Sequence, residues 1–173
     1  MATALGILLA GFISAFAMAA QSVGYIENSG SHAFDQSGCN EDAGIKAIYK
    51  GKMPEAYEML KECEKVDASG IALHHLQALI YYERLGSYKS LKERVEKSQE
   101  LSCRAALKGH DIAVSAIAFM YLNGSSTAGL EPNDEIGICL TKIPKISLEY
   151  VDPKNVEACL SLNPDIDPTY ECY

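Results

Sequence analysis

The sequence predicts an all-α domain built from consecutive antiparallel helix pairs. From residue 39 to residue 162, apolar residues recur at helical spacing, and no run alternates apolar and polar residues as a β-strand would. A tyrosine followed closely by a glycine recurs three times, with 35 and then 38 residues between successive glycines. The pairs are Tyr49 with Gly51, Tyr82 with Gly86, and Tyr121 with Gly124. A helix pair repeated at this period predicts a short α-solenoid, because one pair cannot bury its own apolar face.

Length and composition agree with a single folded domain. The chain has 173 residues, of which 48% are hydrophobic and 22% are charged, so it can bury a core. Its formal net charge is −8. Nucleic acid and anionic membrane surfaces would repel such a chain, so neither is expected as its main partner.

The N-terminal segment predicts export. Residues 4–20 carry no charge, and the apolar run 5–13 is followed by Ala17-Met18-Ala19, the small-residue pattern that precedes a signal-peptidase cleavage site. We therefore expect residues 1–19 to be a signal peptide and residues 20–38, rich in Gly, Ser, Asn and Gln, to be a flexible leader. The alternative is a membrane anchor, because the first three residues lack the usual Lys or Arg, although 17 uncharged residues are short for a span.

The first two expected helices cover residues 54–66 and 69–85. Pro54 suits a first helical turn, where its missing N–H costs nothing, and Gly86 ends the second helix. The apolar stripe of the first contains Ala56, Met59, Leu60, Cys63 and Val66, and that of the second contains Leu73, Leu76, Leu79 and Ile80.

Four further helices are expected in the rest of the domain. They cover residues 88–108, 111–122 and 133–143, and the last begins at Asp152-Pro153, a cap followed by a proline at the first position. Asp111 is expected to cap the second of these. Its apolar stripe should contain Ile112, Ala113, Ala116, Ile117, Met120 and Tyr121.

One unit resembles a known repeat family. The stretch from Ala105 to Ala113, with Ala116, Tyr121, Gly124 and then Asn133-Asp134 opening the partner helix, is similar to a Sel1-like repeat, a relative of the tetratricopeptide repeat. An earlier unit, residues 45–65, resembles a looser tetratricopeptide-type pair. The resemblance implies a right-handed, Sel1-like α-solenoid that binds protein or peptide, with no catalytic residues. The chain departs from the family in the longer segment 125–129 and in having no tryptophan.

The six cysteines predict disulfide bonds in an oxidising compartment. None lies in a Cys-x-x-Cys motif. Residues equally far from a helix-hairpin turn face each other, and Cys39 and Cys63 each lie 12 residues from Gly51, so we expect them to pair. The same argument pairs Cys139 with Cys159, which leaves Cys103 for Cys172 in the tail. The periplasm or the extracellular space is the expected location.

No motif in the sequence predicts catalysis or a cofactor. His74 and His75 are adjacent, so on a helix they point about 100° apart and cannot chelate one metal as an i, i+4 pair would. The tail, residues 163–173, is acidic, aromatic and rich in proline, and is either a cap on the last helix pair or a binding element.

Two functional hypotheses follow. The first is an exported non-enzymatic protein that binds a protein partner, such as a basic effector or toxin neutralised by an immunity protein, or that serves as an envelope scaffold. The expected contact residues are His74, Gln77, Tyr81 and Glu83. The alternative is a small exported enzyme or metal-binding protein that uses His74 and His75.

Overall fold

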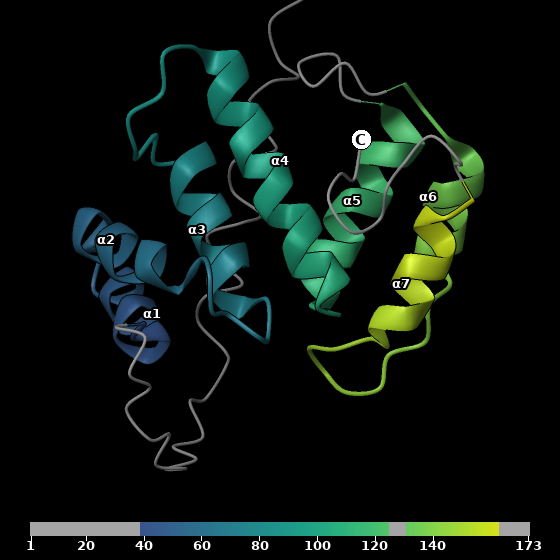
Figure 1. The fold of residues 1–173 in the computed structure, drawn as a ribbon, viewed down its shortest axis with the longest axis horizontal. Coiled ribbons are helices and arrows are strands. Elements are labelled where there is room, and N and C mark those ends of the chain that lie inside the picture. The colour runs from purple at the N-terminus through teal and green to yellow at the C-terminus, as the bar shows by residue number, and fades with distance from the viewer. Residues whose placement is uncertain (1–38, 125–130, 163–173) are drawn as a thin grey trace, which may run out of the picture. The chain divides into compact units, whose positions relative to one another are not determined.

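A computed structural model describes residues 39–124 and 131–162 of the chain, and within these ranges the protein is all-helical, as the sequence predicts. Two isolated antiparallel bridges, His110 with Tyr150 and Lys145 with Val151, are the β-type pairings in the same ranges. The seven helices are α1 (Glu41–Tyr49), α2 (Met53–Cys63), α3 (Ile71–Tyr81), α4 (Leu91–Leu107), α5 (Asp111–Asn123), α6 (Asp134–Thr141) and α7 (Pro153–Leu160) (Figure 1).

Helices α1 and α2 form the first hairpin. The Asn40 side chain accepts a hydrogen bond from the backbone N–H of Ala43 and so caps α1. At the close contact between the two helices, a Cβ on Gly44 would lie 2.6 Å from Leu60 Cγ, so only glycine lets the backbones approach this far. The expected stripe of α2 is confirmed at Leu60 but is wrong at Val66, which is exposed because the helix already ends at Cys63.

Helices α3 and α4 pack side by side (Figure 1) and are both shorter than the sequence predicts. The prediction that α3 continues to residue 85 is wrong, because Arg84, at φ 58°, lies in the left-handed region and breaks the helical backbone. The prediction that α4 begins at residue 88 is also wrong. That helix begins at Leu91, where the Ser90 hydroxyl accepts the N–H of Glu93 as an N-cap.

The apolar face predicted for α5 is wrong in part. Ile112 and Ala116 are exposed, whereas Val114 and Ala118 are buried beside the expected Ile117. The sequence pattern does not fix the orientation of α5, because apolar residues occur on nearly every side of this helix.

Of the N-caps predicted for α5, α6 and α7, the last two are confirmed and the first is wrong. The cap expected at Asp111 lies instead at His110, and the Asp111 carboxylate forms an ion pair with Lys145. The Asn133 side chain caps α6 by accepting the N–H of Ile136, and the Asp152 side chain caps α7 by accepting that of Lys154. Both caps stand where the sequence places the helix starts.

Every helix packs against the next one along the chain, and additional contacts join α1 to α3 and α4 to α7. One continuous core results, with members from all seven helices. The three glycines of the repeat pattern all have positive φ: 72° at Gly51, 96° at Gly86 and 70° at Gly124. The tyrosines of the pattern differ in burial, because Tyr121 is buried but Tyr49 and Tyr82 are exposed. What the three units share is therefore the turn at the glycine and not the environment of the tyrosine.

Two predicted disulfides are present, Cys39–Cys63 and Cys139–Cys159. The first joins the start of α1 to the end of α2, and the second joins α6 to α7. The pairing expected for Cys103 involves Cys172, which lies outside the described residues, as do the expected signal peptide, the leader and the tail. None of the described helices is long and apolar enough to cross a membrane.

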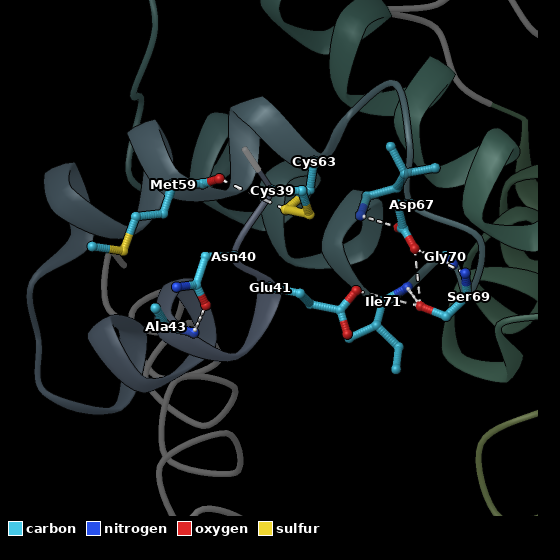
Figure 2. The surroundings of a disulfide bond; sticks show 11 residues. Cys39, Asn40, Glu41, Ala43, Met59, Cys63, Asp67, Ser69, Gly70 and Ile71 are labelled. Carbon is cyan, nitrogen blue, oxygen red and sulfur yellow. Dashed lines mark hydrogen bonds between the residues drawn. A yellow bond between two sulfur atoms is a disulfide. The ribbon is translucent and has the colours of Figure 1, made fainter. Parts of the chain in front are cut away.

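The turn between α2 and α3 is built around a buried carboxylate, beside the first disulfide (Figure 2). Asp67 Oδ1 accepts hydrogen bonds from Ser69 N, Ser69 Oγ and Gly70 N, each 2.9 Å long, and Oδ2 accepts one from Leu73 N at 2.9 Å. The Ser69 hydroxyl also accepts the N–H of Ile71. This carboxylate therefore satisfies donors that the first turn of α3 would otherwise leave unpaired.

Candidate functional site

The four contact residues expected on α3 and just beyond its end divide into two groups. His74 and Gln77 are half-buried, and Gln77 Nε2 donates a hydrogen bond to Ser98 Oγ of α4, 3.0 Å away. Tyr81 and Glu83 are exposed at the C-terminal end of the helix. The structure therefore brings Tyr81 and Glu83 to the surface and places the other two against neighbouring helices.

Two adjacent histidines of α3, His74 and His75, meet a third, His110, from the start of α5. His74 stacks on His110 with 4.8 Å between ring centroids, and His75 lies 5.5 Å from His74. His110 is brought there by Gly109, whose φ of 82° turns the chain between α4 and α5, and its ring lies edge-on to Tyr150. The Nδ1 atoms of His74 and His110 are buried and have no hydrogen-bond partner among the described residues.

The environment of these histidines keeps them neutral. Burial lowers the pKa of His74 to about 4, and the charges of His110 and His75 add to the effect. Burial also lowers the pKa of His75 and of His110, although the carboxylates of Glu149, Asp67 and Asp111 partly oppose this for His110. Within the described ranges, no group of three or more His, Cys, Asp or Glu side chains could hold a metal ion. The cluster is thus a group of neutral rings, of which His110 is buried and His74 and His75 are half-buried.

The exposed aromatic side chains lie on one set of helices. The first helix of each pair is α1, α3 or α5. Tyr49 on α1 is 78% exposed, Tyr81 on α3 is 45% exposed, and Phe119 on α5 is 66% exposed, while Tyr82 at the end of α3 packs edge-on against Tyr81. Among the described residues, no aromatic side chain of a second helix is exposed to this degree. The sequence pattern singles out Tyr81 but misses Phe119, because helical periodicity does not set which face of α5 is buried.

Charge is unevenly distributed between the two parts of the domain. The described residues from Asp111 onward contain seven carboxylates and three lysines. Residues 39–110 contain 11 carboxylates and 12 Lys or Arg residues. The acidic excess among the described residues therefore belongs to α5, α6, α7 and their connections.

A hollowed surface lies where the segment between α3 and α4 meets α2. It consists of two adjoining hollows, of about 350 and 520 Å³, that share Gly86 and Tyr88. We call it the tyrosine–cation groove. The first hollow is also lined by Arg84, Lys89, Ser90, Leu91 and Arg94, and the second by Pro54, Tyr57, Glu58, Lys61, Leu85 and Ser87.

Gly86 lies where the two hollows adjoin. With φ at 96°, a Cβ at this position would lie 2.5 Å from Tyr88 Cε2 and 2.8 Å from Tyr57 Oη. The side chains of Tyr57 and Tyr88 therefore both lie against the backbone of Gly86. Burial raises the pKa of Tyr88, as do the charge and the hydrogen bonding of Tyr57, so the Tyr88 phenol is protonated at physiological pH.

Comparisons of the chain with known protein families, with curated proteins and with solved structures find no match.

Proposed function

We propose that this chain is an exported, non-enzymatic helical repeat protein that binds a protein partner. In this proposal the helix pairs stack as a right-handed, Sel1-like solenoid, and the first helices α1, α3 and α5 face the partner. The packing of each helix on the next one supports the stacked arrangement.

One observation carries the proposal: the exposed aromatic side chains Tyr49, Tyr81 and Phe119 all project from first helices. Aromatic side chains bury a large area with little loss of conformational entropy, so they supply much of the binding energy in protein interfaces. Phe119 has no polar atom of its own with which to interact with water. Its exposure on an almost wholly apolar helix is best explained by a partner that covers it.

The charge distribution defines the partner's chemistry. Because α5, α6 and α7 carry the acidic excess, the complementary surface should combine apolar contacts with lysines or arginines. A basic toxic effector neutralised by an immunity protein, or a basic component of an envelope assembly, has this character. Disulfides at Cys39–Cys63 and Cys139–Cys159 support export to an oxidising compartment, with residues 1–19 proposed as the signal peptide.

The proposal is tested by partner capture from an envelope extract of the source organism at low salt. The test variant replaces Tyr49, Tyr81 and Phe119 by serine. The matched control replaces two exposed apolar residues outside the first helices and the groove, Ile138 on α6 and Leu148 between α6 and α7, by serine. We expect the wild type and the control to retain the same partner and the triple variant to lose it. Equal capture by all three proteins, or by none, would contradict the proposal.

The alternative, an enzyme or metal-binding protein that uses His74 and His75, makes the opposite prediction. Replacing both histidines by alanine should then abolish activity or metal uptake. On the proposal above, the same double variant retains partner capture, provided that circular dichroism shows that it is folded.

A further inference from the structure

We propose that the tyrosine–cation groove is a second binding site and that it takes an extended, acidic segment of a protein partner. The site is separate from the aromatic residues of the first helices. It would bind such a segment whether or not the exposed face of α5 has a partner of its own.

Three cations line the first hollow without a neutralising carboxylate. Arg84, Lys89 and Arg94 are in no ion pair among the described residues, and the Nε–H of Arg94 is buried without an acceptor. By contrast, two other basic residues of α4, Lys97 and Arg104, are paired with carboxylates. Each forms ion pairs with Glu64 and with Glu100. In an acidic chain, three unpaired cations around one hollow favour an anionic ligand.

The backbone at the start of the segment 84–90 has an unusual conformation. Arg84 is the one non-glycine residue in the described ranges with positive φ, a conformation that costs about 1 kcal/mol. The segment 84–90 that begins with this residue contributes lining residues to both hollows. The Glu93 carboxylate is engaged nearby, because it accepts the backbone N–H of Lys89 at 2.6 Å.

The second hollow suits a different part of the same ligand. Pro54, Tyr57 and Leu85 contribute apolar and aromatic groups to its mixed lining, and the Lys61 ammonium lies 5.9 Å from the centroid of the Tyr57 ring. Its one carboxylate, Glu58, lies 3.9 Å from Lys61. Proline and aromatic side chains stack well on such surfaces.

The two hollows together specify the class of ligand. A free phosphate would occupy the cationic hollow and leave the hollow beside Tyr57 empty. An extended peptide spans both, with carboxylates beside Arg84, Lys89 and Arg94 and with a proline or tyrosine against Tyr57. The geometry therefore points to a peptide in which acidic residues alternate with proline and aromatic residues.

The experiment uses a fluorescein-labelled 12-residue peptide built from Asp, Pro and Tyr, and it measures anisotropy against the purified, oxidised protein. The test variant is Arg84→Glu with Lys89→Glu. The control is Lys46→Glu with Lys50→Glu, which changes two exposed, unpaired lysines, one in α1 and one at its C-cap, and alters the net charge equally. A version of the peptide with Asn in place of Asp, inorganic phosphate and a sulfated heparin oligosaccharide are the comparison ligands.

We expect the acidic peptide to bind the wild type and the control with similar affinity, and the test variant at least ten-fold more weakly. The Asn peptide should also lose at least ten-fold, and added NaCl should weaken the binding of the acidic peptide. Equal loss in the test and control variants would overturn the proposal, as would tighter binding of the oligosaccharide or phosphate than of the peptide. Partner capture through Tyr49, Tyr81 and Phe119 is unaffected by these outcomes, so a failure here is distinguishable from a failure of the proposed function.

Discussion

Replacing Asp67 by alanine should strongly destabilise the fold. Its carboxylate accepts four hydrogen bonds, and two of the donors, Gly70 N and Leu73 N, are buried. A buried donor left without a partner costs about 1–3 kcal/mol, so the two together predict a loss of about 3 kcal/mol in the free energy of unfolding. Asp67→Asn keeps one acceptor oxygen and should lose about half as much.

The assay is urea unfolding of the oxidised protein, followed by circular dichroism at 222 nm. Asp42→Asn is the control. This carboxylate is exposed in the first turn of α1 and makes no hydrogen bond among the described residues, so its replacement should cost at most about 0.5 kcal/mol. If Asp67→Ala were as stable as the control, the buried carboxylate would not organise the start of α3, and the reasoning would be refuted.

Three further predictions concern stability, each measured by the same unfolding assay. Removing the Cys39–Cys63 disulfide by a double change to alanine should cost about 3 kcal/mol, because this bond closes a loop with a sequence separation of 24; an unchanged midpoint in denaturant would contradict this. The pKa of His74 is lowered to about 4 by burial, so the unfolded chain takes up a proton near pH 6.5 that the folded protein takes up only near pH 4. Stability should therefore fall by about 2 kcal/mol as the pH drops between these values, after allowance for partial exposure, and His74→Phe should abolish this part of the slope. Gly137→Val should cost about 1–3 kcal/mol, because a Cβ would lie 2.6 Å from Leu122 Cγ, and a loss below about 0.5 kcal/mol would show that α5 and α6 can move apart.

Local sequence rules were sufficient for the starts of α6 and α7 and for two disulfides. Asn133 and Asp152 cap the helices that the sequence begins there, because an N-cap depends on the side chain and on the next three backbone N–H groups alone. The symmetry of Cys39 and Cys63 about Gly51 holds because both arms of the hairpin are nearly regular helices. These features are set within one turn or one hairpin.

Features that depend on contacts between distant segments could not be predicted. The buried face of α5 is selected by α4 and α6, and the sequence of α5 is apolar on the exposed side as well. The stacking of His110 on His74 requires the turn at Gly109. The tyrosine–cation groove likewise depends on the approach of Tyr57 to Gly86. The spacing of apolar residues along the sequence does not predict a contact between these two segments.

Photo-crosslinking in living cells tests the central claim most directly. A benzoylphenylalanine residue is introduced in turn at Tyr49, Tyr81 and Phe119 on the first helices, and at Ile138 on α6 and Leu148 between α6 and α7, all of which are exposed. If the first helices bind a protein partner, the first three positions will crosslink to one and the same protein, and the last two will not. Crosslinks of equal yield from both sets, or none from the first three positions, would contradict the claim.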